Sequence, residues 1–186
     1  MTHTDTEPRD QQLQETAALV ARLIRDIPDF PTQGVLFKDF TPLLADGPAL
    51  RAVVDDIARR HRGDCEVVVG MEARGFILGA AVAYALGVGF VPVRKGGKLP
   101  GATVSADYTL EYGQATLEMH ADALAPGCRV LVLDDVLATG GTAAATCALV
   151  DRCGGIVSAC EFVLEIDALG GRERLAGRRV ISLVHA

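Results

Sequence analysis

Apolar positions recur along the chain with two different periods. Over residues 13–27 and 49–62 they return every three or four residues, which predicts two amphipathic helices. Small-residue helices are expected over 75–86 and 142–153. Strands are predicted from short apolar runs over residues 66–70, 89–93, 130–133, 156–164 and 180–183, and from an apolar–polar alternation over 115–120. This order of elements predicts an α/β fold with a mostly parallel twisted sheet flanked by helices.

The chain shows no internal repeat and no linker, so we expect one domain over residues 1–186. Residues 1–10 are polar and are expected to form a loose tail. Prolines end the first helix, and residues 29–39 are expected to be a loop or a short extended segment. Residues 94–113 hold four glycines and two lysines and are too long for an ordinary connection, which favours a functional flap.

The composition narrows the class of protein. Hydrophobic residues make up 49% of the 186 and charged residues 23%, which is typical of a globular protein. A net charge of −6 argues against a nucleic-acid binder, so an anionic ligand would need a local cluster of cations. The five cysteines include no Cys-x-x-Cys pair, which favours reduced thiols over a disulfide framework or a zinc site. No apolar stretch suits a signal core or a membrane span, so we expect a cytoplasmic protein with no membrane partner.

The segment Val130-Leu-Val-Leu-Asp-Asp-Val-Leu-Ala-Thr-Gly-Gly-Thr142 carries the strongest chemical signal. A buried parallel strand would place Asp134 and Asp135 at its carboxyl end, where open α/β sheets bind ligands. Residues 138–142 would then offer backbone N–H groups and two hydroxyls at a helix N-terminus, an arrangement that suits a phosphate. Taken alone, the acid pair would be as typical of a solvated turn as of a ligand site, and the Thr-Gly-Gly-Thr stretch would be as typical of a helix cap. Their combination in this order favours a ligand site.

This segment resembles the phosphoribosyl pyrophosphate signature of type I phosphoribosyltransferases. The resemblance implies the type I phosphoribosyltransferase fold, with an N-terminal hood and a flexible catalytic loop. It also implies that Asp134 and Asp135 hold the hydroxyls of the ribose. The loop that cradles the 5-phosphate would consist of Ala138, Thr139, Gly140, Gly141 and Thr142.

Two further motifs carry cations. In Glu72-Ala-Arg-Gly-Phe76, the guanidinium of Arg74 is suited to bind a pyrophosphate through two N–H groups. The alternative interpretation is a surface ion pair between Arg74 and Glu72. The stretch 94–100, Arg-Lys-Gly-Gly-Lys-Leu-Pro, would be either a solvated loop or an anion clamp. Both are similar to segments of adenine phosphoribosyltransferases, with Ala73 where that family usually has serine. The resemblance implies a diphosphate site, reached partly across a dimer interface, that is formed by Arg74, Arg94, Lys95 and Lys98.

Two motifs indicate the acceptor base by the same resemblance. Residues 108–113, Tyr-Thr-Leu-Glu-Tyr-Gly, match a mobile-loop stretch of the family, which implies that Glu111 is the catalytic acid/base group and that Tyr112 helps to close the site. Residues 29–39 resemble the family's hood, which would lie within residues 11–40. The implied adenine site consists of Val35, Phe37 and Lys38, the last standing where many members have arginine. Without this context, Phe37 would be interpreted as a core residue and residues 108–113 as a strand edge.

Four motifs in the family's order imply an enzyme of purine salvage. It would transfer phosphoribosyl from 5-phospho-α-D-ribose 1-diphosphate (PRPP) to N9 of adenine, giving AMP and diphosphate. The resemblance also implies a homodimer, and Mg²⁺ that PRPP carries as a chelate. The scattered histidines show no ligand spacing, so none of them is assigned to a metal. Two alternatives stay open: a transferase for hypoxanthine, xanthine or orotate, and a regulator that only senses PRPP.

Overall fold

The computed structural model of the chain describes residues 7–109 and 114–186. The polypeptide forms two compact units, whose boundary lies between Asp56 and Ile57; the prediction of a single domain over 1–186 stays a prediction. No described helix combines the length and the hydropathy that a membrane crossing needs. The smaller unit contains α1 (Glu7–Leu23), β1 (Arg25–Ile27), β2 (Phe37–Asp39), α2 (Thr41–Ala45) and most of α3 (Gly47–His61).

The first helix differs from its predicted range of 13–27. It already begins at Glu7, so the prediction of a loose tail over residues 1–10 is wrong from Glu7 onward. It also ends at Leu23, four residues before the predicted end, because Arg25, Asp26 and Ile27 pair with residues 37–39 as a strand. The last residues of the predicted helix form β1, which pairs antiparallel with β2. Arg25 reinforces this pairing, since its Nη2 donates to Asp39 Oδ2 at 2.6 Å.

The larger unit contains a seven-stranded sheet in the order β5-β6-β4-β3-β7-β8-β9. The five strands from β4 to β9 run parallel, and β6 and β5 extend the edge at β4 in antiparallel pairing. The predicted α/β fold with a mostly parallel sheet is confirmed. Its elements are β3 (Val67–Met71), α4 (Arg74–Leu86), β4 (Gly89–Lys95), β5 (Thr103–Thr109), β6 (Gln114–His120), β7 (Arg129–Leu137), α5 (Gly141–Arg152), β8 (Ile156–Glu165), η1 (Asp167–Leu169), η2 (Gly171–Leu175) and β9 (Val180–His185).

Much of the segment predicted as a flap, residues 94–113, is regular structure. Strand β5 pairs with β6 along its whole length, from Thr103 opposite His120 onward. Partly or fully buried Val104, Ala106 and Tyr108 alternate with the exposed Ser105 and Asp107. This period-two pattern predicts a strand, but the glycines on either side favoured a loop in the sequence analysis.

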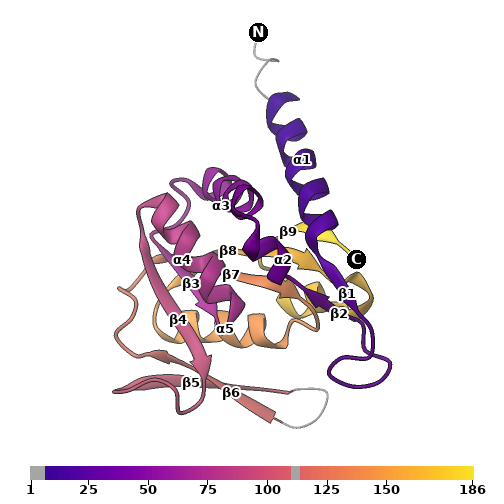
Figure 1. Cartoon of the computed structure of the whole chain (residues 1–186). Helices are drawn as coiled ribbons and strands as arrows, with labels where there is room; N and C mark the ends of the chain where they lie inside the picture. Colours follow the sequence, from indigo (N-terminus) through magenta and orange to yellow (C-terminus); the bar gives the residue numbers. More distant parts are fainter. Residues whose placement is uncertain (1–6, 110–113) are drawn as a thin grey trace. The chain divides into compact units, whose positions relative to one another are not determined.

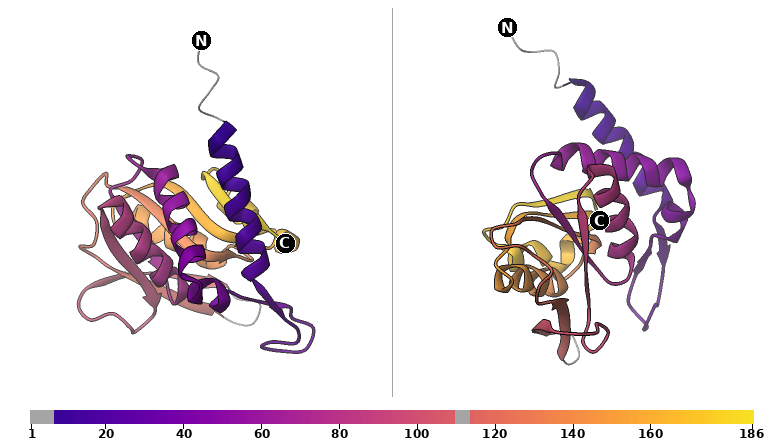
Figure 2. Two further views of the ribbon diagram at one scale, coloured as in Figure 1. Left: turned by 45° about the horizontal axis from the view of Figure 1, so that its top comes forward. Right: turned by 90° about the vertical axis from the view of Figure 1, so that its left-hand side faces the viewer.

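The two crossovers that matter for the site leave β3 and β7 in opposite directions. From β3 the chain passes through α4 to β4, and from β7 it passes through α5 to β8 on the other side. Because such crossovers are right-handed, α4 and α5 cover opposite faces of the sheet (Figure 1 and Figure 2). The carboxyl ends of β3 and β7 are therefore neighbours where the strand order reverses, the place at which open α/β sheets bind ligands.

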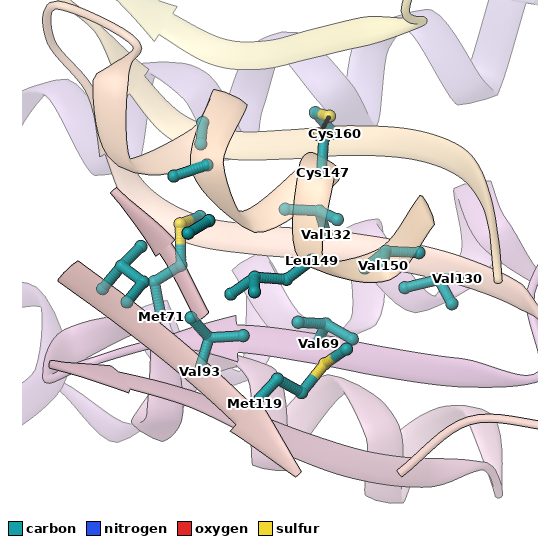
Figure 3. Close-up of a cluster of buried hydrophobic side chains, with 14 of the residues drawn as sticks. Val69, Met71, Val93, Met119, Val130, Val132, Cys147, Leu149, Val150 and Cys160 are labelled. Carbon is teal, nitrogen blue, oxygen red and sulfur yellow. Dashed lines mark hydrogen bonds between the residues drawn. The ribbon is translucent and has the colours of Figure 1, made fainter. Parts of the chain in front are cut away.

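The main hydrophobic core lies between the sheet and α5. Figure 3 shows Val130 and Val132 of β7 among the buried side chains that surround Leu149 of α5. In the same layer, Cys147 Sγ of α5 lies 3.5 Å from Cys160 Sγ of β8. All five cysteines lie in the described ranges, and each is a free thiol in the structure. This packing fixes α5, and therefore its N-terminus, against β7 and β8.

A buried polar cluster fixes the last turn of α3 to the same sheet. Glu161 of β8 and His61 of α3 are both fully buried, and Glu161 Oε2 lies 2.8 Å from His61 Nε2. Arg60 donates a hydrogen bond to the other oxygen of Glu161. Since a buried carboxylate needs charged or hydrogen-bonding partners, the end of α3 and the middle of β8 are held together.

Candidate functional site

The acid pair lies inside strand β7 rather than beyond its end. Strand β7 continues to Leu137, with Asp134 opposite Phe162 and Val136 opposite Leu164 of β8. The prediction that the strand ends at residue 133 was therefore wrong, because β8 runs alongside and continues the ladder. Asp135 is 4% exposed, so the alternative of a solvated turn is wrong as well.

Burial makes it costly to ionise both carboxyls. Burial, together with the charge of Asp135, raises the pKa of Asp134 well above its usual value. Burial also raises the pKa of Asp135, and the Arg74 guanidinium opposes that shift. Arg74 Nε lies 2.6 Å from Asp135 Oδ2 as an ion pair without the alignment of a hydrogen bond. The backbone N–H of Asp135 donates to Asp134 Oδ1 at 2.9 Å. This site therefore favours ligands that donate hydrogen bonds to carboxylates.

The loop between β7 and α5 encloses a cavity of about 80 Å³. All five residues of the predicted phosphate loop, 138–142, line it together with Asp134 and Phe162. Gly140 has a left-handed backbone, with φ of 76°, which leads the chain into α5 and favours glycine. The first N–H groups of a helix lack intrahelical partners and attract anions. The structure thus brings the predicted 5-phosphate ligands and one predicted ribose ligand to one cavity.

Gly171, which the sequence analysis missed, contacts the backbone of this loop. A Cβ on Gly140 would overlap the Gly171 carbonyl, and a Cβ on Gly171 would overlap the Ala138 carbonyl and lie 3.0 Å from Gly140 N. The two backbones are therefore in direct contact, with no space for a side chain on either glycine. The Gly170-Gly171 dipeptide was the available signal in the sequence, but it is equally typical of an ordinary turn.

The predicted diphosphate ligands lie at the carboxyl ends of β3 and β4. Arg74 begins α4 and contacts Asp135, as described above. Arg94 Nε donates to Glu72 Oε2 at 2.9 Å, and its Nη1 donates to the Lys98 carbonyl at 3.2 Å. Arg94 therefore connects the segment after β3 to the turn after β4. Lys95 and Lys98 are exposed.

The predicted adenine ligands lie in the smaller unit. Phe37 is half-buried, and its ring packs edge-on against Phe30 with centroids 5.1 Å apart. Lys38 Nζ lies 2.8 Å from Asp26 Oδ1 across the β1–β2 pair, and Val35 is 40% exposed. The unit therefore presents apolar side chains beside a cation that already has a carboxylate partner.

Glu111 and Tyr112 lie outside the described residues, so their predicted roles stay predictions. The strands on either side of them, β5 and β6, belong to the larger unit, which also contains the acid pair and the phosphate loop.

One group of three side chains in the described ranges could share a metal ion: Glu165, Asp167 and His185. Both carboxylate oxygens of Glu165 are engaged by Arg172, whose Nε and Nη2 donate to them at 3.0 and 2.6 Å. We therefore assign no metal to this group.

Comparison with known proteins gives consistent matches. Residues 43–173 match the model of the phosphoribosyl transferase domain. An adenine phosphoribosyltransferase of Salinispora tropica is 59% identical over 184 residues, which cover 98% of this chain and 97% of that protein. The crystal structure of adenine phosphoribosyltransferase from Thermoanaerobacter pseudethanolicus superposes with a TM-score of 0.89 at 47% identity and covers 91% of this chain and 99% of its own. The Saccharomyces cerevisiae enzyme, solved with an imino-altritol bisphosphate and adenine, gives a TM-score of 0.88 at 36% identity over 91% and 99% of the two chains.

Replacing Gly171 with alanine should displace the phosphate loop. The new Cβ overlaps the Ala138 carbonyl, so we expect a loss of about 1–3 kcal/mol in the free energy of unfolding and weaker binding of ribose 5-phosphate. Denaturant unfolding and calorimetry measure the two effects. Gly47→Ala is the control, because its Cβ would meet no atom within 4 Å; equal ribose 5-phosphate affinities of the two variants would contradict the prediction.

Replacing Asp134 with asparagine should stabilise the ligand-free protein, and the gain should grow with pH. A carboxyl whose pKa is raised on folding stabilises the fold below its unfolded pKa of about 3.9 and loses that contribution as the pH rises through the folded pKa. Asparagine has no such loss, and its amide oxygen can still accept from the N–H of Asp135. Melting temperatures of both proteins between about pH 4 and about pH 8 test this; a constant difference between them would show that the sign is wrong.

Proposed function

This chain belongs to the phosphoribosyltransferase family, and on that premise we propose which of its residues perform each part of the reaction. Its activity is that of an adenine phosphoribosyltransferase, which transfers phosphoribosyl from PRPP to adenine and yields AMP and diphosphate in purine salvage. The observation that supports the assignment of roles is the meeting of an acid pair and a phosphate-sized loop cavity at the switch point of the sheet.

Asp134 and Asp135 accept hydrogen bonds from the 2- and 3-hydroxyls of the ribose. Two hydroxyl donors satisfy carboxylates whose burial otherwise disfavours their charge. The 5-phosphate binds the N–H groups of the phosphate loop, residues 138–142, and the hydroxyls of Thr139 and Thr142. Support comes from the cavity that these residues line with Asp134, and from the attraction of a helix N-terminus for anions.

Arg74, Arg94, Lys95 and Lys98 bind the diphosphate. Its departure from C1 develops negative charge, and fixed cations stabilise that charge in the transition state. Mg²⁺ fits this site, because carboxylate oxygens are hard ligands of the kind that the ion prefers. Two of the carboxylates, Asp135 and Glu72, already have arginine partners, so we assign the ion to PRPP rather than to the protein. When bound with PRPP, the ion neutralises charge on the leaving group.

Adenine binds through Val35, Phe37 and Lys38, with the apolar side chains against the ring. Glu111 exchanges a proton with the purine as N9 attacks C1, and Tyr112 helps to exclude water, which would otherwise hydrolyse the donor. We further propose a homodimer, in which the cationic turn after β4 reaches the partner's site. The cytoplasmic location stays a prediction.

A base-competition assay tests the assignment of substrate. With PRPP and magnesium, turnover of adenine should exceed that of hypoxanthine, xanthine and orotate. Faster turnover of hypoxanthine would favour the alternative transferase. No product from any base at saturating PRPP would favour a protein that only senses PRPP, although the net charge of −6 gives no support to a DNA-binding regulator.

Glu111→Gln should lower kcat by about 10²–10⁴, because glutamine keeps the shape of the side chain but cannot exchange the proton. The affinity for PRPP should stay unchanged, since Glu111 acts on the base. Steady-state kinetics and calorimetry separate the two quantities. An unchanged kcat would remove the proposed role.

A further inference from the structure

A second cavity lies between α5, β5 and η2, all in the larger unit. Its volume is about 340 Å³, within the range of small-molecule sites, about 300–1,000 Å³. Strand β5 lies against α5 along this side (Figure 1). Among the described residues, Gly141 is the one that lines both this cavity and that of the phosphate loop. Apart from Arg152, the residues that α5 contributes are small and leave the space open: Gly141, Ala144, Ala145 and Ala148.

Two arginines at this cavity have donor groups that the protein does not use. Arg174 of η2 lines the cavity and has no hydrogen-bond or ion-pair partner among the described residues. Arg152, at the end of α5, donates from Nη1 to the Ser105 carbonyl of β5, and its other N–H groups have no partner within residues 7–109 and 114–186. Because each guanidinium has five N–H donors and a permanent charge, the cavity favours an anionic ligand.

Strand β5 adds an aromatic ring and a carboxylate to the lining. Tyr108 is half-buried, and Asp107 beside it is exposed. Asp107 Oδ1 accepts from Thr116 Oγ1 at 2.7 Å, which leaves its other oxygen as an acceptor for a ligand. A bare anion such as inorganic phosphate is repelled by this carboxylate and covers none of the apolar surface of the ring and the alanines. A ligand that combines an anionic group, hydrogen-bond donors and a flat apolar ring matches all of these groups.

We propose that this cavity is a second binding site, for a nucleoside monophosphate, distinct from the substrate site. Its phosphate binds the free N–H groups of Arg152 and Arg174. Its base packs against the ring of Tyr108 and the alanines of α5, and a ribose hydroxyl or an amino group of the base donates to Asp107. None of these residues has a role in the transfer reaction proposed above, so the second site does not depend on that assignment.

Methyl NMR of the full chain observes the two sites separately in one titration with AMP. With isotope-labelled alanine methyl groups, Ala144, Ala145 and Ala148 report on the second cavity, and Ala138 reports on the phosphate loop. AMP should shift both sets of signals, with a different affinity for each set. Adenosine alone and inorganic phosphate alone should each bind the second cavity about tenfold more weakly than AMP, because each makes only part of the contacts. Equal affinities of AMP and inorganic phosphate there would overturn the assignment to a nucleoside monophosphate.

Arg174→Gln tests the second site directly, and Arg62→Gln is the matched control. Arg62 is also exposed and without a partner in the described part of the chain, but it does not line the cavity. Arg174→Gln should weaken AMP binding at the second cavity about tenfold, the effect of losing one charge-assisted contact, and should leave the Ala138 titration unchanged. Arg62→Gln should change neither, and circular dichroism checks that both variants are folded. An Ala148 signal that does not shift, or that follows the Ala138 curve in all three proteins, would overturn the second site.

Discussion

Asp134 and Asp135 occupy neighbouring positions in a buried strand, where burial raises the pKa of both carboxyls. Ionising both of them therefore requires positive charge or hydrogen-bond donors close by. Each crossover helix begins beside the pair, α4 after β3 and α5 after β7. The positive ends of two helix dipoles are therefore directed to the place where two carboxylates need compensation. Helix N-termini also attract phosphate groups, so the same arrangement of helices suits the substrate that we propose.

This electrostatic arrangement requires that α5 cannot shift. Its inner face carries Leu149 and Cys147 in the core between helix and sheet, and Gly171 is in contact with the loop that precedes it. Because protein interiors are close-packed, such contacts resist displacement. The N–H groups that we assign to the 5-phosphate are thus held in position before the ligand arrives, which reduces the entropy lost on binding.

Much of the site was predictable from sequence because its parts are local. The strand, the acid pair and the predicted phosphate loop are contiguous over residues 130–142, and their order already favours a ligand site at this edge of the sheet. Contacts between distant segments were not predictable in this way. Nothing within the stretch around Arg74 identifies Asp135 as its partner, and the end of the first helix was decided by pairing of β1 with β2 rather than by its apolar stripe. The extension of β7 past residue 133 likewise depends on β8 beside it.

The contact between Gly140 and Gly171 means that the motif to which we assign phosphate binding is not a single stretch of sequence. A designer who grafts residues 130–142 onto another parallel sheet would transfer the loop without the backbone that shapes it. The graft would need a second glycine-bearing segment at van der Waals distance, and a library that varies the loop alone would not sample that segment.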